Sequence, residues 1–366
     1  MKILFLNTNI GYGGASKMMV WVANQCAEQG HDVFFLTYRN KDVLQKLNVR
    51  IKLVQETLEE EKGKVKFIAT VMWLHKFIKA NYFDLGVAFL SPSILRMAIA
   101  AKGTKMKVVF SQRGDPYHRR ISHNLKMKVV GLLNRWAFNQ ADGYVFQTQM
   151  AQAYYSKVIQ RRSEVIPNPI WATARTRRSK GDVRKSFVAI GRLDLKQKRQ
   201  DLMIEAFNLI SYKYPDFKLE IYGDGEDEVK VKELVASNPN IQLMGKTNNT
   251  AAAIRNAWAA VLASDFEGIP NALLEAMSLG VPSISTDCSP GGAAMLIRNK
   301  ENGLLVPRGD SIALAGAMEY TILHHEETEM IGARGMEVNE LYSENTIRKE
   351  WMDFLAMVYY GKNNSR

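Results

Sequence analysis

The sequence predicts an α/β protein built from two doubly wound, parallel-sheet domains, and three observations predict it. The chain has 366 residues, more than a single hydrophobic core usually organises. Short strand-like runs alternate with helix-length amphipathic segments along the chain, a pattern typical of parallel sheets covered by helices. Near the middle, residues 167–186 form a basic and polar segment with two prolines, as expected between domains.

The first half contains six strand-like runs. They read KILFLN (2–7), DVFFLTY (32–38), RIKLV (50–54), LGVAFL (85–90), KVVFS (107–111) and GYVFQT (143–148). Helical segments are expected between them, at 15–29, 64–80 and 121–140 among others. The apolar residues of the last segment recur at helical spacing, and we expect this stripe to face the core: Ile121, Leu125, Val129, Leu132 and Trp136.

The second half repeats the pattern. Its strand-like runs are SFVAIG (186–191), KLEIYG (218–223), IQLMG (241–245), AAVLAS (259–264), VPSIS (281–285) and NGLLVP (302–307), each followed by a helical segment. The closing segment TIRKEWMDFLAMVYY also has apolar residues at helical spacing. We therefore expect an N-terminal domain at 1–168, a linker at 169–185, a C-terminal domain at 186–345, and a terminal helix and tail at 346–366.

Composition indicates an ordinary soluble protein, with 46 % hydrophobic and 23 % charged residues. Two distant cysteines, Cys26 and Cys288, give no disulfide framework and suggest reduced core thiols. The N-terminal run is too short for a signal peptide, and the longest apolar run is broken by Pro92 and Arg96. We expect a cytoplasmic protein without a membrane span.

The net charge of +12 is distributed unevenly. Residues 1–180 hold 29 Lys or Arg against 11 Asp or Glu, a net charge of +18, while the remaining residues hold 20 against 26, a net charge of −6. The first half is therefore expected to meet something anionic, such as nucleic acid, a membrane surface or a phosphate-bearing substrate. A solvated basic surface without a partner is the alternative. Nucleic acid is disfavoured because no aromatic stacking platform interleaves the basic residues.

A glycine-rich turn, NIGYGGASKMM, follows the first strand. Gly11, Gly13 and Gly14 permit a tight turn whose amides can cradle a phosphate at the start of the next helix. The run nearly matches a dinucleotide-binding fingerprint, with Ser16 in place of the third glycine, and Arg39 could meet the 2′-phosphate of NADP. A plain strand-to-helix turn is the structural alternative.

The first strand of the second half leads into GRLDLKQKRQDLMIEAF. Arg192 follows the strand and Lys198 stands at the next helix start, with Lys196 and Arg199 as neighbours of the same charge. Two cations beside a helix N-terminus suit a diphosphate that leaves during a reaction. The acids in YGDGED are expected to cap the following helix rather than bind a metal.

Two glutamates, Glu267 and Glu275, flank a helix start in DFEGIPNALLEAMSLGVPSIS. Eight helical steps would separate them by roughly 12 Å along the axis. The carboxylate pair of a retaining glycosidase is about 5 Å apart, so these two are not expected to form an acid–nucleophile pair. They are better placed to hold two parts of one long ligand, with the helix N-terminal amides between them receiving negative charge.

Residues Glu267 to Glu275 resemble the E-x-x-x-x-x-x-x-E motif of glycosyltransferase family 4, whose members are retaining enzymes of the GT-B fold. The resemblance covers nearly the whole chain. It includes, in order, GGAS, GHDV, VIPNPI, GRLDLKQK, YGDGE and NGLLVP. It implies two Rossmann-like domains facing a cleft, with the C-terminal helix crossing back to the first domain.

The resemblance also implies roles for particular residues. Glu275 would bind the ribose of a nucleotide-sugar, Glu267 would lie near the sugar, and Arg192 and Lys198 would stabilise the leaving diphosphate. No metal or organic cofactor is then required. The remaining implied donor-binding residues are Gly13, Gly14, Gly225, Gly268, Ile269, Asn271 and Ala272.

The acceptor side departs from the family pattern. Many relatives have a histidine where this chain has Arg113, and His118 is the nearest histidine that follows. Arg113, Asp115 and His118 are the candidate acceptor-side residues. A second departure is Met295, at a position that is often glutamate in the family.

The sequence thus predicts a metal-independent hexosyltransferase that uses a nucleoside-diphosphate sugar, with a UDP-sugar favoured over GDP-mannose. Its acceptor would be a polysaccharide, oligosaccharide or lipid-linked saccharide at the inner face of the cell membrane. Adsorption to anionic lipid is assigned to Arg119, Arg120, Lys126 and Lys128, without insertion. The alternatives are a nucleotide-sugar epimerase or phosphorylase of the same fold, or an NADP-dependent oxidoreductase.

Overall fold

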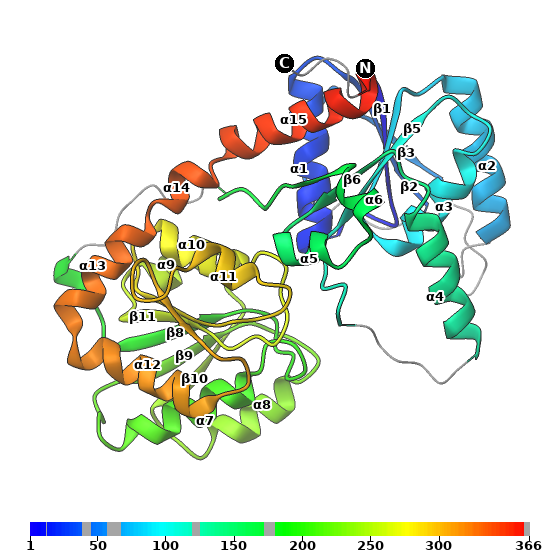
Figure 1. Cartoon of the computed structure of the whole chain (residues 1–366). Coiled ribbons are helices and arrows are strands. Elements are labelled where there is room, and N and C mark those ends of the chain that lie inside the picture. Colours follow the sequence, from blue (N-terminus) through cyan, green and yellow to red (C-terminus); the bar gives the residue numbers. More distant parts are fainter. Residues whose placement is uncertain (12, 39–44, 57–66, 119–124, 172–179, 362–366) are drawn as a thin grey trace. The chain divides into compact units, whose positions relative to one another are not determined.

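The structure is a computed structural model of the chain that describes residues 1–11, 13–38, 45–56, 67–118, 125–171 and 180–361 (Figure 1). The chain divides into two compact units. The first unit is Met1–Ile166 with Ile347–Arg366, and the second is Pro167–Thr346. The middle of the predicted linker 169–185 lies outside the described residues, as do Arg39, Arg119 and Arg120.

Seven parallel strands form the sheet of the first unit, in the order β3-β2-β1-β4-β5-β6-β7. Their bounds are β1 Lys2–Asn7, β2 Asp32–Thr37, β3 Lys52–Gln55, β4 Leu85–Ala88, β5 Lys107–Gln112, β6 Gly143–Phe146 and β7 Ser163–Val165. The six predicted strands are confirmed, whereas β7 was not predicted. The order reverses between β1 and β4, which makes the sheet doubly wound.

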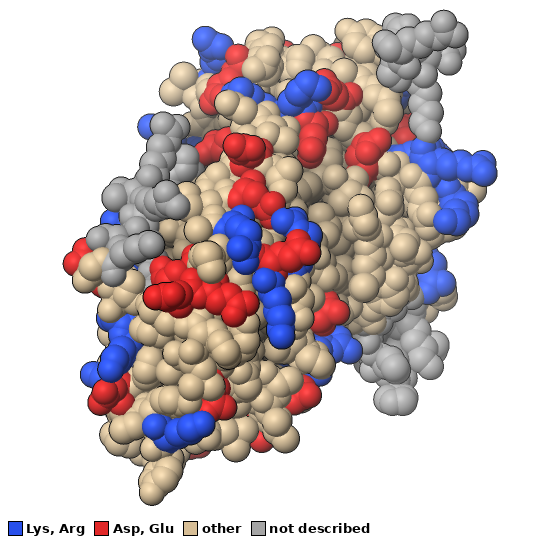
Figure 2. Space-filling view, turned by 60° about the vertical axis from the view of Figure 1, so that its left-hand side comes forward, with Lys and Arg blue, Asp and Glu red and all other residues tan. Residues whose placement is uncertain are grey.

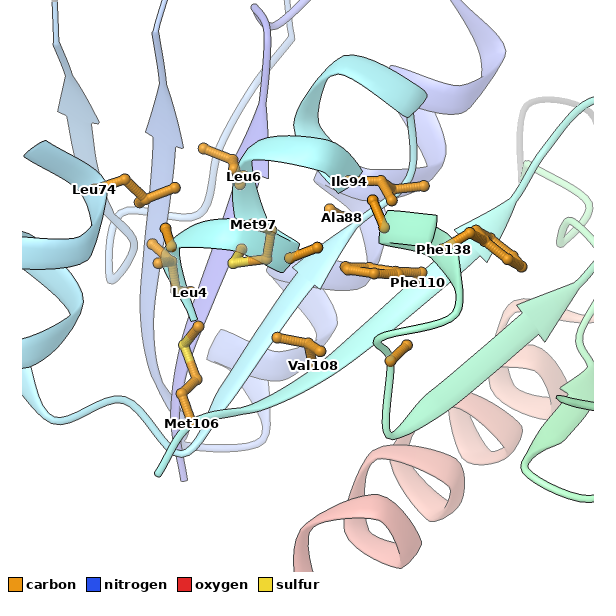
Figure 3. Close-up of a cluster of buried hydrophobic side chains, with 14 of the residues drawn as sticks. Leu4, Leu6, Leu74, Ala88, Ile94, Met97, Met106, Val108, Phe110 and Phe138 are labelled. Atoms are coloured by element: carbon orange, nitrogen blue, oxygen red, sulfur yellow. The ribbon is translucent and has the colours of Figure 1, made fainter. Parts of the chain in front are cut away.

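Helices flank this sheet (Figure 1). They are α1 Gly14–Glu28, α2 Phe67–Asn81, α3 Ser91–Ala100, α4 Leu125–Phe138, α5 Gln149–Ala153, α6 Lys157–Gln160 and α15 Glu344–Tyr360. Side chains alternate between the two faces of each strand. Leu4 and Leu6 of β1 join the cluster drawn in Figure 3, which also contains Phe110 and Met97. Because both faces are covered, the central strands β1, β2 and β4 are mostly buried along their length, whereas the edge strand β3 is largely exposed.

The C-terminal helix α15 packs on the first unit, as the predicted fold requires. Trp351 is fully buried and its ring stacks on Phe89, with 5.6 Å between ring centroids. Lys107 Nζ donates to the carbonyl oxygens of Val358 and Tyr359 at 2.9 and 3.1 Å. The expectation that the terminal helix returns to the first domain is confirmed.

One prediction about the core is wrong. The described members of the expected core stripe of α4 are largely exposed: Val129 is 48 % exposed, Leu132 64 % and Trp136 36 %. Helix α4 instead buries Ala137 and Phe138 at its C-terminal end. The predicted helix is present, but its apolar face does not point into the core.

The second unit is built on a six-stranded parallel sheet in the order β10-β9-β8-β11-β12-β13. Its strands are β8 Ser186–Ile190, β9 Lys218–Tyr222, β10 Ile241–Gly245, β11 Ala259–Leu262, β12 Ser283–Thr286 and β13 Leu304–Val306. All six were predicted. The reversal between β8 and β11 places the carboxyl ends of these two strands side by side, where ligands bind in doubly wound sheets.

The helices of the second unit cover both faces of its sheet (Figure 1). They are α7 Gln200–Ser211, α8 Glu228–Val235, α9 Thr250–Arg255, α10 Asn271–Ser278, α11 Gly292–Leu296, α12 Ser311–Leu323, α13 His325–Gly335 and α14 Val338–Leu341, with a 3₁₀ turn at Lys180–Asp182. One face is covered by α7 and α12, whose apolar side chains share a core with Phe187, Leu219 and Ile284 of the sheet.

A partly buried ion pair links β9 to the residue Arg184 that precedes β8. Glu220 of β9 is 8 % exposed and accepts hydrogen bonds from Arg184 through both oxygens, at 3.2 and 2.9 Å, and from the Tyr222 hydroxyl at 3.0 Å. Burial raises the pKa of the Glu220 carboxyl, but the hydrogen bonds from Arg184, Ser186 and Tyr222 and the charge of Arg184 outweigh it. Its net pKa therefore lies below the ordinary value of 4.5.

We expect Glu220→Gln to destabilise the protein by about 1.5 kcal/mol at neutral pH, as for loss of hydrogen bonds to a charged group. A carboxyl whose pKa is lower in the folded than in the unfolded state stabilises the folded protein at pH values above its unfolded-state pKa. This contribution is lost as the pH falls through the folded-state pKa. The difference in unfolding free energy between wild type and variant should therefore shrink below pH 4.5. Urea titrations at several pH values measure it, with exposed Glu226→Gln as the control. A difference independent of pH would contradict this account.

Candidate functional site

The predicted residues of the second half gather at the carboxyl ends of β8 and β11. The β8 end leads into the segment with Arg192 and Lys198, and the β11 end leads into Asp265–Glu267. Lys198 and Glu267 form an ion pair through Nζ and Oε1, with side chains 19 % and 12 % exposed. The Ser264 hydroxyl donates to the same Glu267 oxygen at 3.1 Å. A half-buried cation and carboxylate thus meet at the switch point of the sheet.

The two loops that carry this ion pair are fixed to each other by further hydrogen bonds. Asp265 N donates to Gln197 O at 2.9 Å, and Gln197 Nε2 donates to Phe266 O at 3.0 Å. Arg199 bridges Asp201 and Asp265, with 3.1 Å in each ion pair. Lys198 and Glu267 are therefore held in position by their neighbours along the chain.

Arg192 lies at the same strand end but in a different environment. Its side chain is 61 % exposed and its guanidinium donates to Asp194 at 3.0 Å and to Gln197 at 2.9 Å. These partners orient the guanidinium while leaving it open to solvent. Arg192 and Lys198 are both cationic, and only Lys198 pairs directly with Glu267 among the described residues.

Two glycines allow the loops of the site to approach backbone to backbone. A Cβ atom on Gly292 would overlap the carbonyl oxygen of Gly268, and one on Gly225 would overlap the backbone of Leu193. The Gly268 segment is also joined to the next loop by Glu267 N donating to Ser289 O at 2.7 Å. Gly225, predicted as a donor-binding residue, therefore has a structural reason to be glycine.

Helix α10 begins directly after these loops, with Pro270 as the N-cap residue and no side-chain cap. The Ile269 side chain is 4 % exposed and belongs to the core, so only its backbone is available to a ligand. Asn271 is exposed, and its Oδ1 accepts from Asn168 Nδ2 at 2.8 Å. Without a side-chain cap, the first amides of α10 can receive a negatively charged ligand.

Glu275 lies one turn further along α10 and has a partner within the protein. Its Oε1 accepts a hydrogen bond from the Thr250 hydroxyl at 2.6 Å. Thr250 is the first residue of α9, which packs against α10. From the sequence, a ligand was the expected partner of this carboxylate, whereas Thr250 already engages one of its oxygens.

Other acidic and sulfur groups near the site are structural. Asp227 is the N-cap residue of α8, as predicted, but its carboxylate accepts from Leu195 N at 3.0 Å and makes no cap hydrogen bond to its own helix. Burial, reinforced by the charge of Glu267, raises the pKa of the Cys288 thiol to about 12. Within the described ranges, no group of three or more His, Cys, Asp or Glu side chains lies close enough to hold a metal ion.

In the first unit, Gly13 is the N-cap of α1 and Gly14 its first residue, and both are exposed. Ser16, at the place of the third fingerprint glycine, is buried and its hydroxyl accepts from Asn7 Nδ2 at 3.4 Å. Gly13 and Gly14 therefore offer backbone at the start of α1. The described residues do not include Arg39, on which the NADP alternative depended.

The candidate acceptor-side residues follow β5. The Arg113 guanidinium lies over the rings of Phe89 and Trp351, 4.9 and 5.4 Å from their centroids, and burial lowers its pKa to about 9. Asp115 accepts from Tyr117 N at 2.8 Å, which shapes the turn, and His118 is exposed. Arg113 is thus anchored by aromatic packing, and His118 projects toward solvent.

The charges of the second unit are largely paired with each other. Most of the ion pairs between described residues lie in Pro167–Thr346, including Arg184–Glu220, Lys213–Glu319 and Arg298–Glu337. On the face drawn in Figure 2, Lys and Arg side chains lie among Asp and Glu side chains. This unit therefore presents a mixed surface around its site, in keeping with its modest net charge.

Solved structures identify the fold. The Anabaena protein HepE, in complex with UDP, matches with a TM-score of 0.76 and 18 % identity, over 97 % of this chain and 100 % of that one. TarM of Staphylococcus aureus matches with a TM-score of 0.77 and 14 % identity, over 99 % and 100 %. The fold is that of GT-B glycosyltransferases.

Family models identify the family. "Glycosyltransferase Family 4" matches residues 12–171, and "Glycosyl transferases group 1" matches residues 184–324. The chain belongs to this group 1, family 4 class of glycosyltransferases. Membership in this family favours a glycosyltransferase over the NADP-dependent oxidoreductase, the alternative that the glycine-rich turn after β1 had suggested.

Two full-length relatives agree. An uncharacterized glycosyltransferase of Haemophilus influenzae is 23 % identical over 97 % of this chain and 99 % of its own. An α-1,4-N-acetyl-D-galactosaminyltransferase of Campylobacter jejuni is 25 % identical over 98 % and 99 %, and its name specifies an undecaprenol-diphosphate-linked glycan as acceptor.

Sequence reasoning missed several residues of the site. Thr250, Ser264 and Gln197 contact the predicted glutamates or their loop. Thr250 and Ser264 belong to no charged or glycine-rich motif, and Gln197 is an uncharged residue inside the motif GRLDLKQK. Asp265 follows the strand β11 (Ala259–Leu262) and precedes Glu267, and its place after a strand end was the available signal for it. Thr250 and Glu275 are brought together only by the packing of α9 on α10.

Proposed function

We propose that this glycosyltransferase moves a hexose from a nucleoside-diphosphate sugar to its acceptor with retention of the anomeric configuration and without a metal. A UDP-sugar is the favoured donor, with GDP-mannose as the alternative. The observation that carries the proposal is the Lys198–Glu267 pair, which lies beside the uncapped N-terminus of α10 at the switch point of the second sheet. The UDP named in the HepE structures supports the favoured base.

In this proposal, two cationic side chains stabilise the diphosphate as it leaves. The Lys198 ammonium has three N–H donors, so it can keep Glu267 and still donate to a phosphate oxygen. The Arg192 guanidinium, oriented by Asp194 and Gln197, supplies a second positive charge. Charge that develops on the leaving group would then be stabilised without a metal ion.

The hydroxyl groups of the nucleotide-sugar need hydrogen-bonding partners in addition to charged groups. In this proposal Glu267 lies near the sugar, and the backbone from Gly268 to Ala272, with Asn271, binds sugar hydroxyls and phosphate. Glu275 accepts from the ribose hydroxyls through the oxygen that Thr250 does not use. Gly13, Gly14 and Gly225 complete the proposed donor contacts.

The acceptor is proposed to be a polysaccharide, an oligosaccharide or a lipid-linked saccharide, met by Arg113, Asp115 and His118. The Campylobacter relative, whose acceptor is lipid-linked by name, supports this class. We further propose that the basic first unit contacts anionic lipid at the cytoplasmic face of the membrane. No described helix combines the length and apolar character needed to cross a bilayer.

A panel of nucleotides tests the donor class. UDP should raise the free energy of unfolding by about 2.7 kcal/mol at 100 times its dissociation constant, whereas NADP should not raise it. Transfer from UDP-sugars, followed as UDP release, should continue in excess EDTA. The control is the same assay with added Mg²⁺, which should change the rate little. Stabilisation by NADP alone, or loss of transfer in EDTA, would overturn the donor class or the metal-free chemistry respectively.

A further inference from the structure

Arg199, which lies between Lys198 and helix α7, has a backbone conformation that few residues other than glycine adopt. Its φ and ψ are 52° and 48°, in the left-handed region, and it is the N-cap residue of α7. Tyr82 and Lys300 are the other described non-glycine residues with positive φ, and neither lies in the loops that follow β8 and β11. A β-carbon makes this conformation unfavourable, so other interactions have to hold it.

The Arg199 side chain is bound by two carboxylates. Its Nε donates to both oxygens of Asp201, at 3.1 and 3.2 Å, and its Nη1 donates to Asp265 Oδ2 at 3.1 Å. The Arg199 side chain is 25 % exposed, and those of Asp201 and Asp265 are 39 % and 28 % exposed. A planar guanidinium can span two carboxylates in this way, whereas an ammonium is a single point charge. Arg199 therefore links the first turn of α7 to the loop after β11.

Asp265 is a firm partner for Arg199, because other loops of the second unit also hold it. Its amide donates to Gln197 O at 2.9 Å, in the loop after β8. Its carbonyl oxygen accepts from Ser289 N at 3.1 Å, after β12, and from Arg308 Nη1 at 3.3 Å, after β13. The position of Asp265 is therefore fixed independently of its ion pair with Arg199.

Lys198 immediately precedes Arg199, so its position depends on the Arg199 backbone. The Lys198 amide donates to Asp194 O at 2.7 Å, and its side chain lies across Gly191, where a Cβ atom would be 3.4 Å from Lys198 Cε. Beyond Arg199, the apolar side chains of α7 belong to the core of the second unit. Because that core holds the helix, a change in φ and ψ of Arg199 would move Lys198 rather than α7.

We propose that Arg199 is a positioning residue for Lys198. By binding its two aspartates, Arg199 keeps its own backbone left-handed and so holds the Lys198 ammonium beside Glu267. The inference rests on the proposed role of Lys198 in the departure of the diphosphate, and Arg199 itself does not contact the substrate. Since a misplacement of about 1 Å can cost about 100-fold in rate, a small movement of Lys198 should be visible in the turnover number.

Two substitutions separate the backbone of Arg199 from its guanidinium. Arg199→Gly and Arg199→Ala both remove the guanidinium, but glycine adopts the left-handed conformation readily and alanine does not. We expect Arg199→Ala to lower the turnover number by about tenfold, with little change in the Michaelis constant for the donor, because Lys198 is displaced. Arg199→Gly should retain several times the turnover of Arg199→Ala. Equal turnover in the two variants would leave no role for the backbone and would contradict the inference.

Arg199→Lys provides a second comparison, which does not depend on the folding of Arg199→Ala. Lysine keeps the positive charge, but it has a β-carbon and lacks the fork that spans the two aspartates. Its turnover should therefore be lower than that of Arg199→Gly, although glycine carries no charge. The opposite order would assign the effect to charge and would overturn the inference. Turnover is expressed per folded molecule, measured by circular dichroism, so a loss of folded protein does not imitate a slower reaction.

Lys198→Ala separates this inference from the proposed function. If Arg199 acts through Lys198, Arg199→Ala should lower turnover little in the Lys198→Ala background, so the two losses are not additive. A further loss of about tenfold there would give Arg199 a role of its own and would rule the inference out. Full turnover in Lys198→Ala alone would refute the leaving-group role itself. A slow Lys198→Ala beside a fully active Arg199→Ala would refute only the positioning role.

Arg298→Ala is the matched control. Arg298 also pairs with two carboxylates, Glu301 at 2.8 Å and Glu337 at 2.7 Å, but it lies in the segment between α11 and β13. Its replacement should leave the turnover number and the Michaelis constant for the donor at their wild-type values. A loss as large as that in Arg199→Ala would show that breaking any such ion pair slows the enzyme, and the positioning role of Arg199 would be withdrawn.

Discussion

Lys198→Ala is expected to lower the turnover number by a factor of about 100 to 1000, as for removal of one preorganised donor to developing charge. The side chain is 19 % exposed and its only described ion-pair partner is Glu267. Removing it takes a cation from the proposed leaving group and also leaves the Glu267 carboxylate half-buried without its counter-charge. Both effects oppose build-up of negative charge at this position.

Steady-state kinetics with saturating acceptor measure this effect, and Lys196→Ala is the matched control. Lys196 is two residues away, carries the same charge and is exposed, so its replacement should change turnover little. Lys198→Arg keeps the charge but not the compact geometry, and should restore only part of the activity. Full turnover with a raised Michaelis constant for the donor would make Lys198 a ground-state anchor instead.

Glu275→Ala should weaken binding of the nucleotide-sugar by about 10-fold to 100-fold, the range for losing hydrogen bonds to a charged group. Glu275 has one oxygen engaged by Thr250 at 2.6 Å and offers the other to the proposed ribose hydroxyls. Calorimetry with UDP and with the UDP-sugar measures the loss, which should be similar for both because both carry ribose.

Two variants separate charge from position at this site. Glu275→Gln keeps an oxygen for the Thr250 hydroxyl but removes the charge, so an intermediate affinity is expected. Thr250→Val removes the hydroxyl that orients Glu275 and should weaken binding less than Glu275→Ala does. Unchanged affinity in Glu275→Ala would rule out the ribose contact and would leave Glu275 as a partner of Thr250 alone.

Most of the fold could be predicted from the sequence because strands of parallel sheets are buried on both faces. Runs such as KILFLN and SFVAI are apolar at successive positions, and few other structures produce such short runs between amphipathic segments. The strand β7 has three residues, SEV, and offers no such run. Its place is set by pairing with β6, which no local pattern reveals.

The orientation of α4 could not be predicted for a different reason. A stripe of apolar residues at helical spacing indicates that a helix has an apolar face, but it does not say what covers that face. The helices α7 and α15 carry similar stripes and do pack on cores, so the usual interpretation holds for them. Only the exposure of Leu132 and its neighbours distinguishes α4.

For the candidate site, the sequence predicted the region in which the residues lie better than it predicted which residues contact each other. The rule that ligands bind at strand ends located Lys198 and Glu267 in one region. Their direct pairing depends on the adjacency of β8 and β11, strands that are more than 60 residues apart in the chain. The bond between Thr250 and Glu275 likewise depends on tertiary packing, and neither residue signals the other in the sequence.

The contact of Gly292 with the Gly268 carbonyl has a consequence for how readily this protein can change its donor. Because any Cβ at residue 292 would overlap that oxygen, variants at this position would displace the loop before they could alter selectivity. Asn271, by contrast, is exposed at the start of α10 and has room for substitution. Libraries aimed at new donor sugars should therefore keep residue 292 fixed and vary residue 271.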